Sequence, residues 1–226
     1  MKIQQRHLWS VTVEEAIAIQ QQLQLEVITT DRLGAVNYVA GVDVGFEEDG
    51  EVSRAAVVVL SFPGLQLQEQ AIAVCPTTFP YTPGLLSFRE VPVILEALKK
   101  LRTTPDLILC DGQGIAHPRR FGLGCHLGLL TEVPTIGVAK SLFIGEHDEL
   151  ALEKGSWQSL RDRGEVIGAV VRSRTNVKPI YISVGHLICL PTAIDYVLRC
   201  TPKYRLPQTT RLADQLSRSA SLVIGH

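Results

Sequence analysis

The sequence has few of the features that mark secreted, membrane or strongly basic proteins. Its five cysteines are odd in number and form no Cys-x-x-Cys pair, which disfavours a disulfide framework and indicates reduced thiols. No apolar run reaches the roughly 20 residues that a membrane span needs, and the N-terminus carries charged residues where a leader would be apolar. The net charge of -1 at pH 7 gives no global basic field for nucleic acids, although it leaves room for a local patch. We therefore expect a cytoplasmic protein without a membrane anchor.

The sequence is rich in apolar residues instead. Of its 226 residues 46% are hydrophobic and 20% are charged, a balance that suits a soluble protein with a substantial core. We expect one domain that covers residues 1–226, and a monomer.

A carboxylate follows directly on a buried strand in the middle of the chain. Residues 107–110 are apolar, Asp111 comes next, and Gly112 and Gly114 then allow a tight turn. Open α/β sheets place their sites at the carboxyl ends of strands, so Asp111 is a candidate site residue. Taken alone, Asp111 would be explained equally well as the cap of the next helix.

A second strand, residues 38–46, carries one carboxylate between glycines. Alternation along this strand places Gly41, Asp43 and Gly45 on one face, away from the apolar neighbours. An ionised carboxylate buried in a sheet is costly unless a cation or hydrogen bonds compensate for it. Two strands of this kind predict one shared cation site, and oxygen ligands favour magnesium or manganese over zinc.

Two prolines, Pro80 and Pro83, enclose Tyr81 in a stiff loop. An aromatic ring held outward in this way suits a wedge that enters a base stack. The alternative is a buried tyrosine in a rigid turn.

Glu90 and Lys140 are candidate site residues that also have simple structural explanations. Ser87 and Glu90 match a capping box, although Pro92 would then fall past the first turn, where its missing N–H costs a helix hydrogen bond. Lys140 ends a short strand, residues 135–139, where a lysine can reach a phosphate or simply lie at the surface.

Two later regions favour surface roles. Residues 145–164 indicate an exposed, loop-rich insertion that Trp157 packs down. A basic rim with one aromatic residue indicates a phosphate-binding surface, and equally a solvated face; it consists of Lys203, Tyr204, Arg205 and Arg211.

The order of elements is that of the ribonuclease H-like fold: three antiparallel strands, a helix, a strand, a helix and a strand, with acids on the first and fourth strands. We expect an α/β fold in which a mixed central sheet has three antiparallel strands followed by parallel strands, with helices on both faces. The remaining expected elements are helices over residues 13–25, 191–200 and 209–219 and strands over residues 55–60, 65–74, 165–172 and 179–184.

Several motifs together resemble the endonuclease V family. They are Gly41-Val42-Asp43, Pro80-Tyr81-Thr82-Pro83-Gly84, Phe88-Arg89-Glu90, Asp111-Gly112-Gln113-Gly114 with Ala116-His117-Pro118-Arg119, and the stretch from Thr135 to Ser141. The resemblance runs from the first helix to residues 207–213. Thr82 departs from the apolar residue that is common in the wedge of the family, and Asp214 stands where the family can have a histidine.

The resemblance implies a magnesium-dependent endonuclease, in which manganese can substitute, acting in DNA repair. Such an enzyme recognises deoxyinosine in DNA and hydrolyses the second phosphodiester bond on its 3′ side, leaving a 3′-hydroxyl and a 5′-phosphate. The expected metal ligands are Asp43, Glu90, Asp111 and Asp214. Lys140 would stabilise charge on the phosphate, and His117 would contact a phosphate or move a proton.

The resemblance also implies how the substrate is held. The wedge would be the loop of Pro80, Tyr81, Thr82 and Pro83, which fills the gap left by a flipped base. The base pocket would use backbone N–H groups to detect the keto oxygen of hypoxanthine, at Gly84, Leu86, Gly112, Gly114 and Leu142. The expected phosphate contacts are Arg119, Ser141 and Arg211.

Three alternatives remain open. One is an inosine-specific ribonuclease, because 2′-hydroxyl discrimination depends on contacts that a sequence does not display. Another is a relative of actin-like phosphotransferases, whose phosphate-binding turns resemble the segments around Asp43 and Asp111, although these enzymes need two copies of the fold. The third is a nucleic-acid binding module without catalysis, which the intact set of Asp43, Glu90 and Asp111 disfavours.

Overall fold

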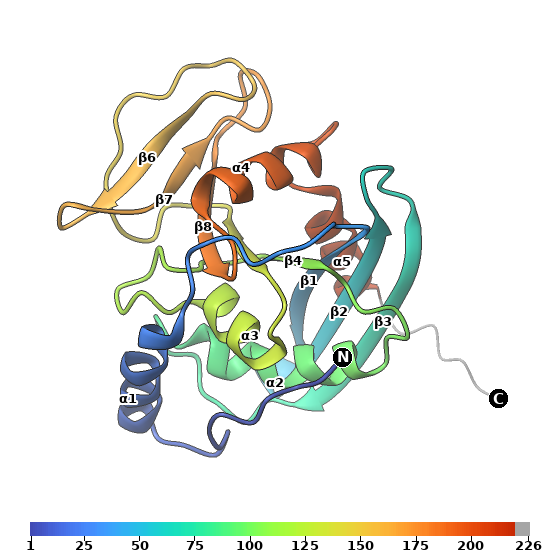
Figure 1. The fold of residues 1–226 in the computed structure, drawn as a ribbon. Helices are drawn as coiled ribbons and strands as arrows, with labels where there is room; N and C mark the ends of the chain where they lie inside the picture. Colours follow the sequence, from blue (N-terminus) through green and yellow to red (C-terminus); the bar gives the residue numbers. More distant parts are fainter. Residues whose placement is uncertain (220–226) are drawn as a thin grey trace.

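The computed structural model describes residues 1–219; residues 220–226, the end of the expected domain, lie outside the described part. Five helices of this part surround one mixed sheet (Figure 1). The helices are α1 (Val13–Leu23), α2 (Leu86–Lys99), α3 (Leu123–Thr131), α4 (Leu190–Arg199) and α5 (Gln208–Arg218), with short 3-10 turns η1 (Gln24–Glu26) and η2 (Glu48–Gly50). The strands are β1 (Tyr38–Glu47), β2 (Val52–Ser61), β3 (Leu67–Pro76), β4 (Leu107–Cys110), β5 (Thr135–Ala139), β6 (Trp157–Asp162), β7 (Glu165–Val171) and β8 (Ile180–His186).

The strands of residues 1–219 lie in the order β3-β2-β1-β4-β5-β8-β7-β6. Strands β1, β4 and β5 are parallel, and the strands on either side of them pair antiparallel. This arrangement confirms the expected ribonuclease H-like fold, with its antiparallel meander followed by parallel strands. No helix in residues 1–219 is long and apolar enough to cross a membrane.

The register between β1 and β4 sets the position of the acids. Gly41 lies opposite Leu109 and Val42 lies opposite Cys110, so the next residues, Asp43 within β1 and Asp111 just past the end of β4, lie side by side. Because parallel strands present their carboxyl ends at one edge of the sheet, the two carboxylates meet there.

Helices cover both faces of the sheet (Figure 1). One face packs its aliphatic side chains against α2 and α3, and α1 adds an outer layer on these helices. The other face packs against α4 and α5. Burial of these apolar surfaces is the main stabilising contribution, at about 25 cal/mol per Å² removed from water.

Glycines allow α5 and α3 to approach the sheet closely. A Cβ at Gly41 would collide with the backbone of Thr209 at the start of α5. On the opposite face, a Cβ at Gly128 of α3 would collide with Thr135 and His186. The glycine at position 128 of α3 therefore serves helix–sheet packing.

Three details differ from the prediction. Residues 145–164 are not only loop: they include β6, which pairs with β7, and Trp157 is 46% exposed on this edge strand and therefore does not pack the segment down. Helix α2 begins at Leu86 without a side-chain cap, so the expected capping box at Ser87 is wrong. Pro92 stays inside α2, and the helix continues past it because both flanking turns pack on the sheet.

Candidate active site

Three aspartates from distant parts of the chain meet at the carboxyl ends of the central strands. Asp43 lies on β1, Asp111 follows β4 directly, and Asp214 lies on α5. One carboxylate oxygen from each lies within 4.8 Å of the others, and all three side chains are partly buried. The structure therefore brings together three of the four expected metal ligands, Asp43, Asp111 and Asp214.

The docking of α5 explains how Asp214 reaches the sheet. Gly41 and Gly45 lie on the same face of β1 as Asp43, and without side chains there the helix backbone comes close to the strand. Ser217, one turn beyond Asp214, donates a hydrogen bond to Asp43 Oδ2 at 2.6 Å. Sequence analysis missed Ser217, because nothing in the local pattern of α5 shows which face meets β1.

Glu90 lies beside this cluster. It projects from the first turns of α2 with only 9% of its surface exposed, and burial, followed by the negative charges of Asp43 and Asp111, raises its pKa to about 8. Glu90 is not one of the three carboxylates that lie within 4.8 Å of one another. Of the four expected ligands, Glu90 is therefore the one that stands next to the group and not within it.

Lys140 lies against the same acids. Its Nζ is 2.5 Å from Asp111 Oδ2 and 3.9 Å from Asp214 Oδ1. Burial opposes the charged form of Lys140, but the hydrogen bond to Asp111 and the surrounding carboxylates raise its pKa overall. Ser141 follows it at the exposed end of β5.

The donor set fits a divalent cation that prefers oxygen ligands. The clustered atoms are all carboxylate oxygens, with no histidine or cysteine among them in the described residues. Burial raises the pKa of Asp43, and the nearby charges of Asp111 and Asp214 act in the same direction, so a bound cation would favour the ionised form of this carboxylate. Magnesium and manganese suit such a site better than zinc.

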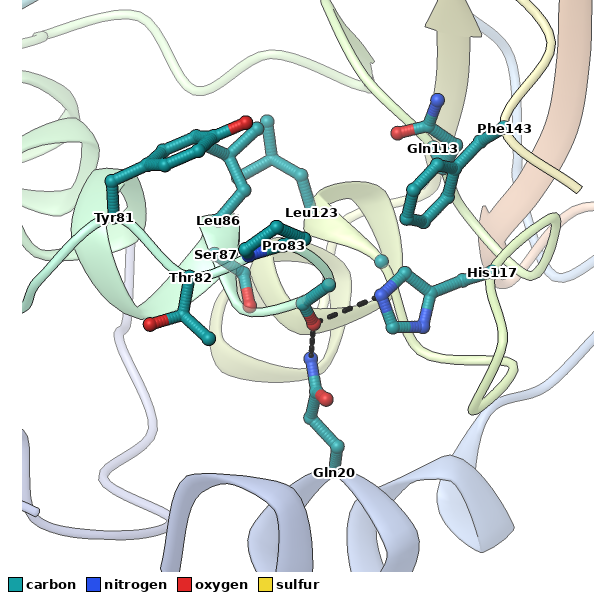
Figure 2. A pocket seen from close by; sticks show the side chains of 12 residues that line it. Gln20, Tyr81, Thr82, Pro83, Leu86, Ser87, Gln113, His117, Leu123 and Phe143 are labelled. Atoms are coloured by element: carbon teal, nitrogen blue, oxygen red, sulfur yellow. Dashed lines mark hydrogen bonds between the residues drawn. The ribbon is translucent and has the colours of Figure 1, made fainter. Parts of the chain in front are cut away.

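A pocket of about 130 Å³ is lined by Tyr81 on one side and by His117 and Phe143 on the other (Figure 2). This volume is below the range of about 300–1,000 Å³ that drug-sized ligands occupy, so the pocket suits a small group. Its lining combines residues of four segments, namely Gln20, Tyr81, Thr82, Pro83, Gly84, Leu86, Ser87, Gln113, His117, Gly122, Leu123 and Phe143.

The sequence predicted part of this lining. Gly84 and Leu86 line the pocket, whereas Gly112, Gly114 and Leu142 are not among its lining residues. Gly114 instead donates its N–H to Ser183 Oγ at 2.8 Å and packs against β8. Leu142 is exposed, and the next residue, Phe143, takes the place expected for it.

The loop of the expected wedge lies at the rim of the pocket (Figure 2). Tyr81 is 72% exposed, so the buried-tyrosine alternative is wrong. Thr82 and Pro83 line the pocket, and Pro80 is exposed behind them.

Three donors converge on the carbonyl of Gly84 and hold this loop in place. Gln20 Nε2 donates to it at 3.0 Å, Arg119 Nη2 at 2.7 Å, and His117 Nε2 lies 3.0 Å away. Gly84 has φ of 79°, a conformation that a residue with a side chain adopts only at a cost. Arg119, expected to contact phosphate, is engaged here, and its Nε also donates to Gln20 Oε1 at 2.5 Å.

His117 lies in the pocket wall with both ring nitrogens in use. Its Nε2–H donates to the Gly84 carbonyl, and its Nδ1 accepts the N–H of Arg119 at 3.2 Å. Burial, followed by the charges of Arg119 and Arg120, lowers the pKa of His117 to about 4. The geometry therefore favours a neutral wall residue over the proton carrier that the sequence suggested.

The basic rim is largely used within the protein. Arg205 donates to the carbonyls of Lys140 and Pro179, at 2.5 and 2.7 Å, and so holds the end of β5. Arg211 stacks on Tyr204, with 4.5 Å between the Arg211 Cζ and the ring centroid. The buried Nε of Arg211 has no hydrogen-bond partner among the described residues.

The pocket and the acidic cluster share two segments. Ser87 lines the pocket and Glu90 stands beside the acids three residues later on α2, which is less than one helical turn. Asp111 and the pocket residue Gln113 are two residues apart. A small group in the pocket would therefore lie next to the candidate cation site.

Comparison with known proteins identifies relatives across this whole region. The Endonuclease V family model matches residues 20–215, a range that contains the acids and the pocket. Endonuclease V of Trichormus variabilis is 66% identical over 218 residues, covering 96% of this chain and 99% of that protein. The crystal structure of endonuclease V from Streptomyces avermitilis has a TM-score of 0.89 at 44% identity and covers 96% of both chains. Ciona intestinalis endonuclease V in complex with a 24mer DNA containing an inosine followed by a ribo-adenosine has a TM-score of 0.79 at 30% identity, covering 91% of this chain and 96% of that one.

Proposed function

This chain belongs to the endonuclease V family, and from that premise we propose that it is a magnesium-dependent endonuclease that recognises deoxyinosine in DNA. The observation that carries the proposal is the convergence of Asp43, Asp111 and Asp214 next to a pocket of the size of a small group. The complex of the Ciona relative with inosine-containing DNA supports the substrate class.

The proposed reaction is hydrolysis of the second phosphodiester bond on the 3′ side of deoxyinosine. It leaves a 3′-hydroxyl and a 5′-phosphate, and it serves DNA repair in the cytoplasm, with manganese able to replace magnesium. These details follow from the family resemblance. A cut two bonds away from the recognised base fits a pocket that stands beside the acids rather than between them.

Each part of the site has a task in this reaction. Asp43, Asp111 and Asp214 would hold the cation, and Glu90 would stand beside them. A bound divalent cation supplies Lewis-acid chemistry, which neutralises charge on the phosphoryl oxygens and lowers the pKa of water. Lys140 places a preorganised positive charge at the same position, which stabilises the charge that develops on the phosphate.

The loop at the pocket rim would open the substrate. A base must leave the stack before a protein can read its edge, and the exposed ring of Tyr81 can fill the gap that it leaves. The Gly84 carbonyl is fixed by Gln20, Arg119 and His117, so the backbone that faces the flipped base is rigid before the base arrives.

Cleavage of labelled oligonucleotides tests the proposal. A duplex with a single deoxyinosine is incubated with magnesium, and an otherwise identical duplex with deoxyadenosine serves as the control. We expect one cut, two bonds 3′ of deoxyinosine, no cut in the control and none after chelation of the metal. Equal cutting of both duplexes would contradict the proposal, and so would cutting that persists after chelation.

An inosine-specific ribonuclease is the second candidate. The DNA in the Ciona complex carries a ribonucleotide after the inosine, so a relative accommodates a 2′-hydroxyl at that position. Matched DNA and RNA strands with one inosine separate the two candidates, because the preferred strand will show the larger cleavage rate constant.

A further inference from the structure

A chain of hydrogen bonds leads from the pocket to the N-terminal segment. Ser87, which lines the pocket, has its Oγ 2.9 Å from His126 Nδ1. His126 Nε2 lies 2.7 Å from His7 Nε2, and His7 Nδ1 lies 2.7 Å from the carbonyl of Leu8. The proposed reaction makes no use of these histidines.

The carbonyl at the end fixes the direction of every bond in this chain. A carbonyl only accepts, so His7 must carry its proton on Nδ1, and neutral His7 then offers a lone pair at Nε2. His126 must therefore donate from Nε2, which leaves its Nδ1 as an acceptor. The hydroxyl of Ser87 must then donate to His126, and the lone pairs of its oxygen remain for the pocket.

The surroundings disfavour the charged form of both rings and hold the rings in place. His126 is completely buried, and burial, followed by the proximity of His7, lowers its pKa well below the usual range. Burial also lowers the pKa of His7. Trp9 stacks on His126 with 5.3 Å between ring centroids, and Phe88 packs edge-on at 5.1 Å.

We propose that Ser87 is a specificity-determining residue that accepts a hydrogen bond from the N1–H of a 6-oxopurine in the pocket, and that His126 and His7 fix it in this accepting state. Hypoxanthine carries a proton on N1, whereas adenine presents a lone pair there, which would face the lone pairs of Ser87. This inference rests on the proposed function, since it concerns the base that the pocket reads.

Binding of strands that differ in one base tests the role of Ser87. Fluorescence anisotropy in a chelating buffer, where no cutting occurs, gives dissociation constants for strands with hypoxanthine, with unsubstituted purine, which lacks N1–H and O6, and with 7-deazahypoxanthine, which keeps both. In the parent chain the hypoxanthine strand binds more tightly than the purine strand. In Ser87→Ala this preference falls about tenfold, the loss expected for one buried neutral hydrogen bond. The preference between hypoxanthine and 7-deazahypoxanthine is unchanged.

A second variant tests the histidine chain without touching the pocket. His7→Phe keeps an aromatic ring against Trp9 but removes the acceptor that orients His126, so Ser87 is no longer fixed and the preference for hypoxanthine over purine falls at least threefold. Exposed His147 provides the matched control, and His147→Phe keeps the parent preference.

The outcomes separate this inference from the proposed function. If Ser87→Ala weakens binding of the hypoxanthine and purine strands by the same factor, Ser87 is only structural and the inference is overturned. An unchanged preference in His7→Phe overturns the role of the histidine chain. A fourth strand with adenine at the same position tests the proposed function: if the parent chain shows no preference for hypoxanthine over adenine, the proposed function fails instead.

Discussion

Lys140 Nζ lies 2.5 Å from Asp111 Oδ2, on a carboxylate that also faces the other acids of the cluster. The ammonium therefore offsets part of the negative charge at the position where a divalent cation would bind. Because two positive groups near one carboxylate repel each other, the lysine and the cation compete for Asp111 before the substrate phosphate arrives and attracts both.

Replacement of this lysine tests both effects. Lys140→Ala should lower the single-turnover cleavage rate constant roughly a hundredfold, the size found when one preorganised charge-stabilising group is lost. It should also lower the magnesium concentration for half-maximal rate, because the competitor is gone. Lys99→Ala removes an exposed lysine that pairs with Glu96 and should change neither value. An unaltered rate constant in Lys140→Ala would exclude the lysine from catalysis.

Neutralisation of one aspartate should separate cutting from binding. Asp111→Asn should reduce cleavage at least a thousandfold and leave the dissociation constant for inosine-containing DNA within about threefold, because the pocket and the wedge are intact. Asp195→Asn, on the exposed side of α4, is the control for both measurements. Normal cleavage by Asp111→Asn would remove this residue from the site.

Strand patterns made two of the three clustered aspartates, Asp43 and Asp111, predictable from sequence. Alternation in β1 placed Asp43 and its glycines on one face, and four apolar residues before Asp111 marked the end of a central strand. These are local properties with a period of two, so a short window contains them. The family resemblance then added Asp214 and assigned roles to Glu90, Lys140 and the wedge loop.

The other contacts of the site could not be predicted, because they depend on how segments that are distant in the sequence pack together. Ser217 is a polar residue in an amphipathic helix, and only the approach of α5 to β1 shows that it contacts Asp43. Gln20 lies in the helix expected over residues 13–25, to which no role in the site was assigned, yet its side chain donates a hydrogen bond to the carbonyl of Gly84 in the pocket loop. The expectation that Trp157 packs residues 145–164 down was wrong for the same reason, because sequence alone does not show that this segment forms an exposed edge strand.

The exposed wedge ring should contribute to binding and not to stability. Tyr81→Ala should weaken binding of inosine-containing duplex by roughly ten- to a hundredfold, the range for one aromatic ring stacked on a base. Tyr81→Phe keeps the ring and should bind like the parent. Neither change should move the midpoint of thermal unfolding by more than about one degree, since a residue with 72% of its surface exposed stabilises little. Loss of binding in Tyr81→Phe would show that the hydroxyl, not the ring, matters.

Close packing of α5 should tie catalysis to a glycine outside the site. In Gly41→Ala the new methyl group meets the backbone of Thr209, so α5 must shift and carry Asp214 with it. We expect the free energy of unfolding to fall by about 1–3 kcal/mol, as for an overpacked core, and the cleavage rate constant to fall at least tenfold. Gly34→Ala is the matched control, because nothing lies within 4 Å of its new Cβ. Full activity of Gly41→Ala would show that the position of α5 is not critical.

The neutral state of His117 should make the protein sensitive to acid. Burial and the neighbouring arginines lower the pKa of His117 in the folded chain to about 4, whereas an unfolded histidine titrates near 6.5. Above pH 6.5 neither state binds this proton, so the stabilisation is complete there. As pH falls from about 6.5 to about 4, the unfolded chain binds a proton that the folded chain excludes, and the free energy of unfolding decreases, by about 2–3 kcal/mol for this one group.

A comparison of variants isolates the decrease that is due to His117. The pKa values of His186 and His126 are lowered in the folded chain as well, so these residues also make the free energy of unfolding decrease in acid. Urea unfolding at pH 7.5 and pH 5, in a chelating buffer, should show a smaller decrease for His117→Asn than for the parent, whereas His147→Asn, at an exposed position, should follow the parent. Equal decreases in the parent and in His117→Asn would mean that His117 is protonated in the folded protein, and its hydrogen bond to Gly84 would then involve a charged ring.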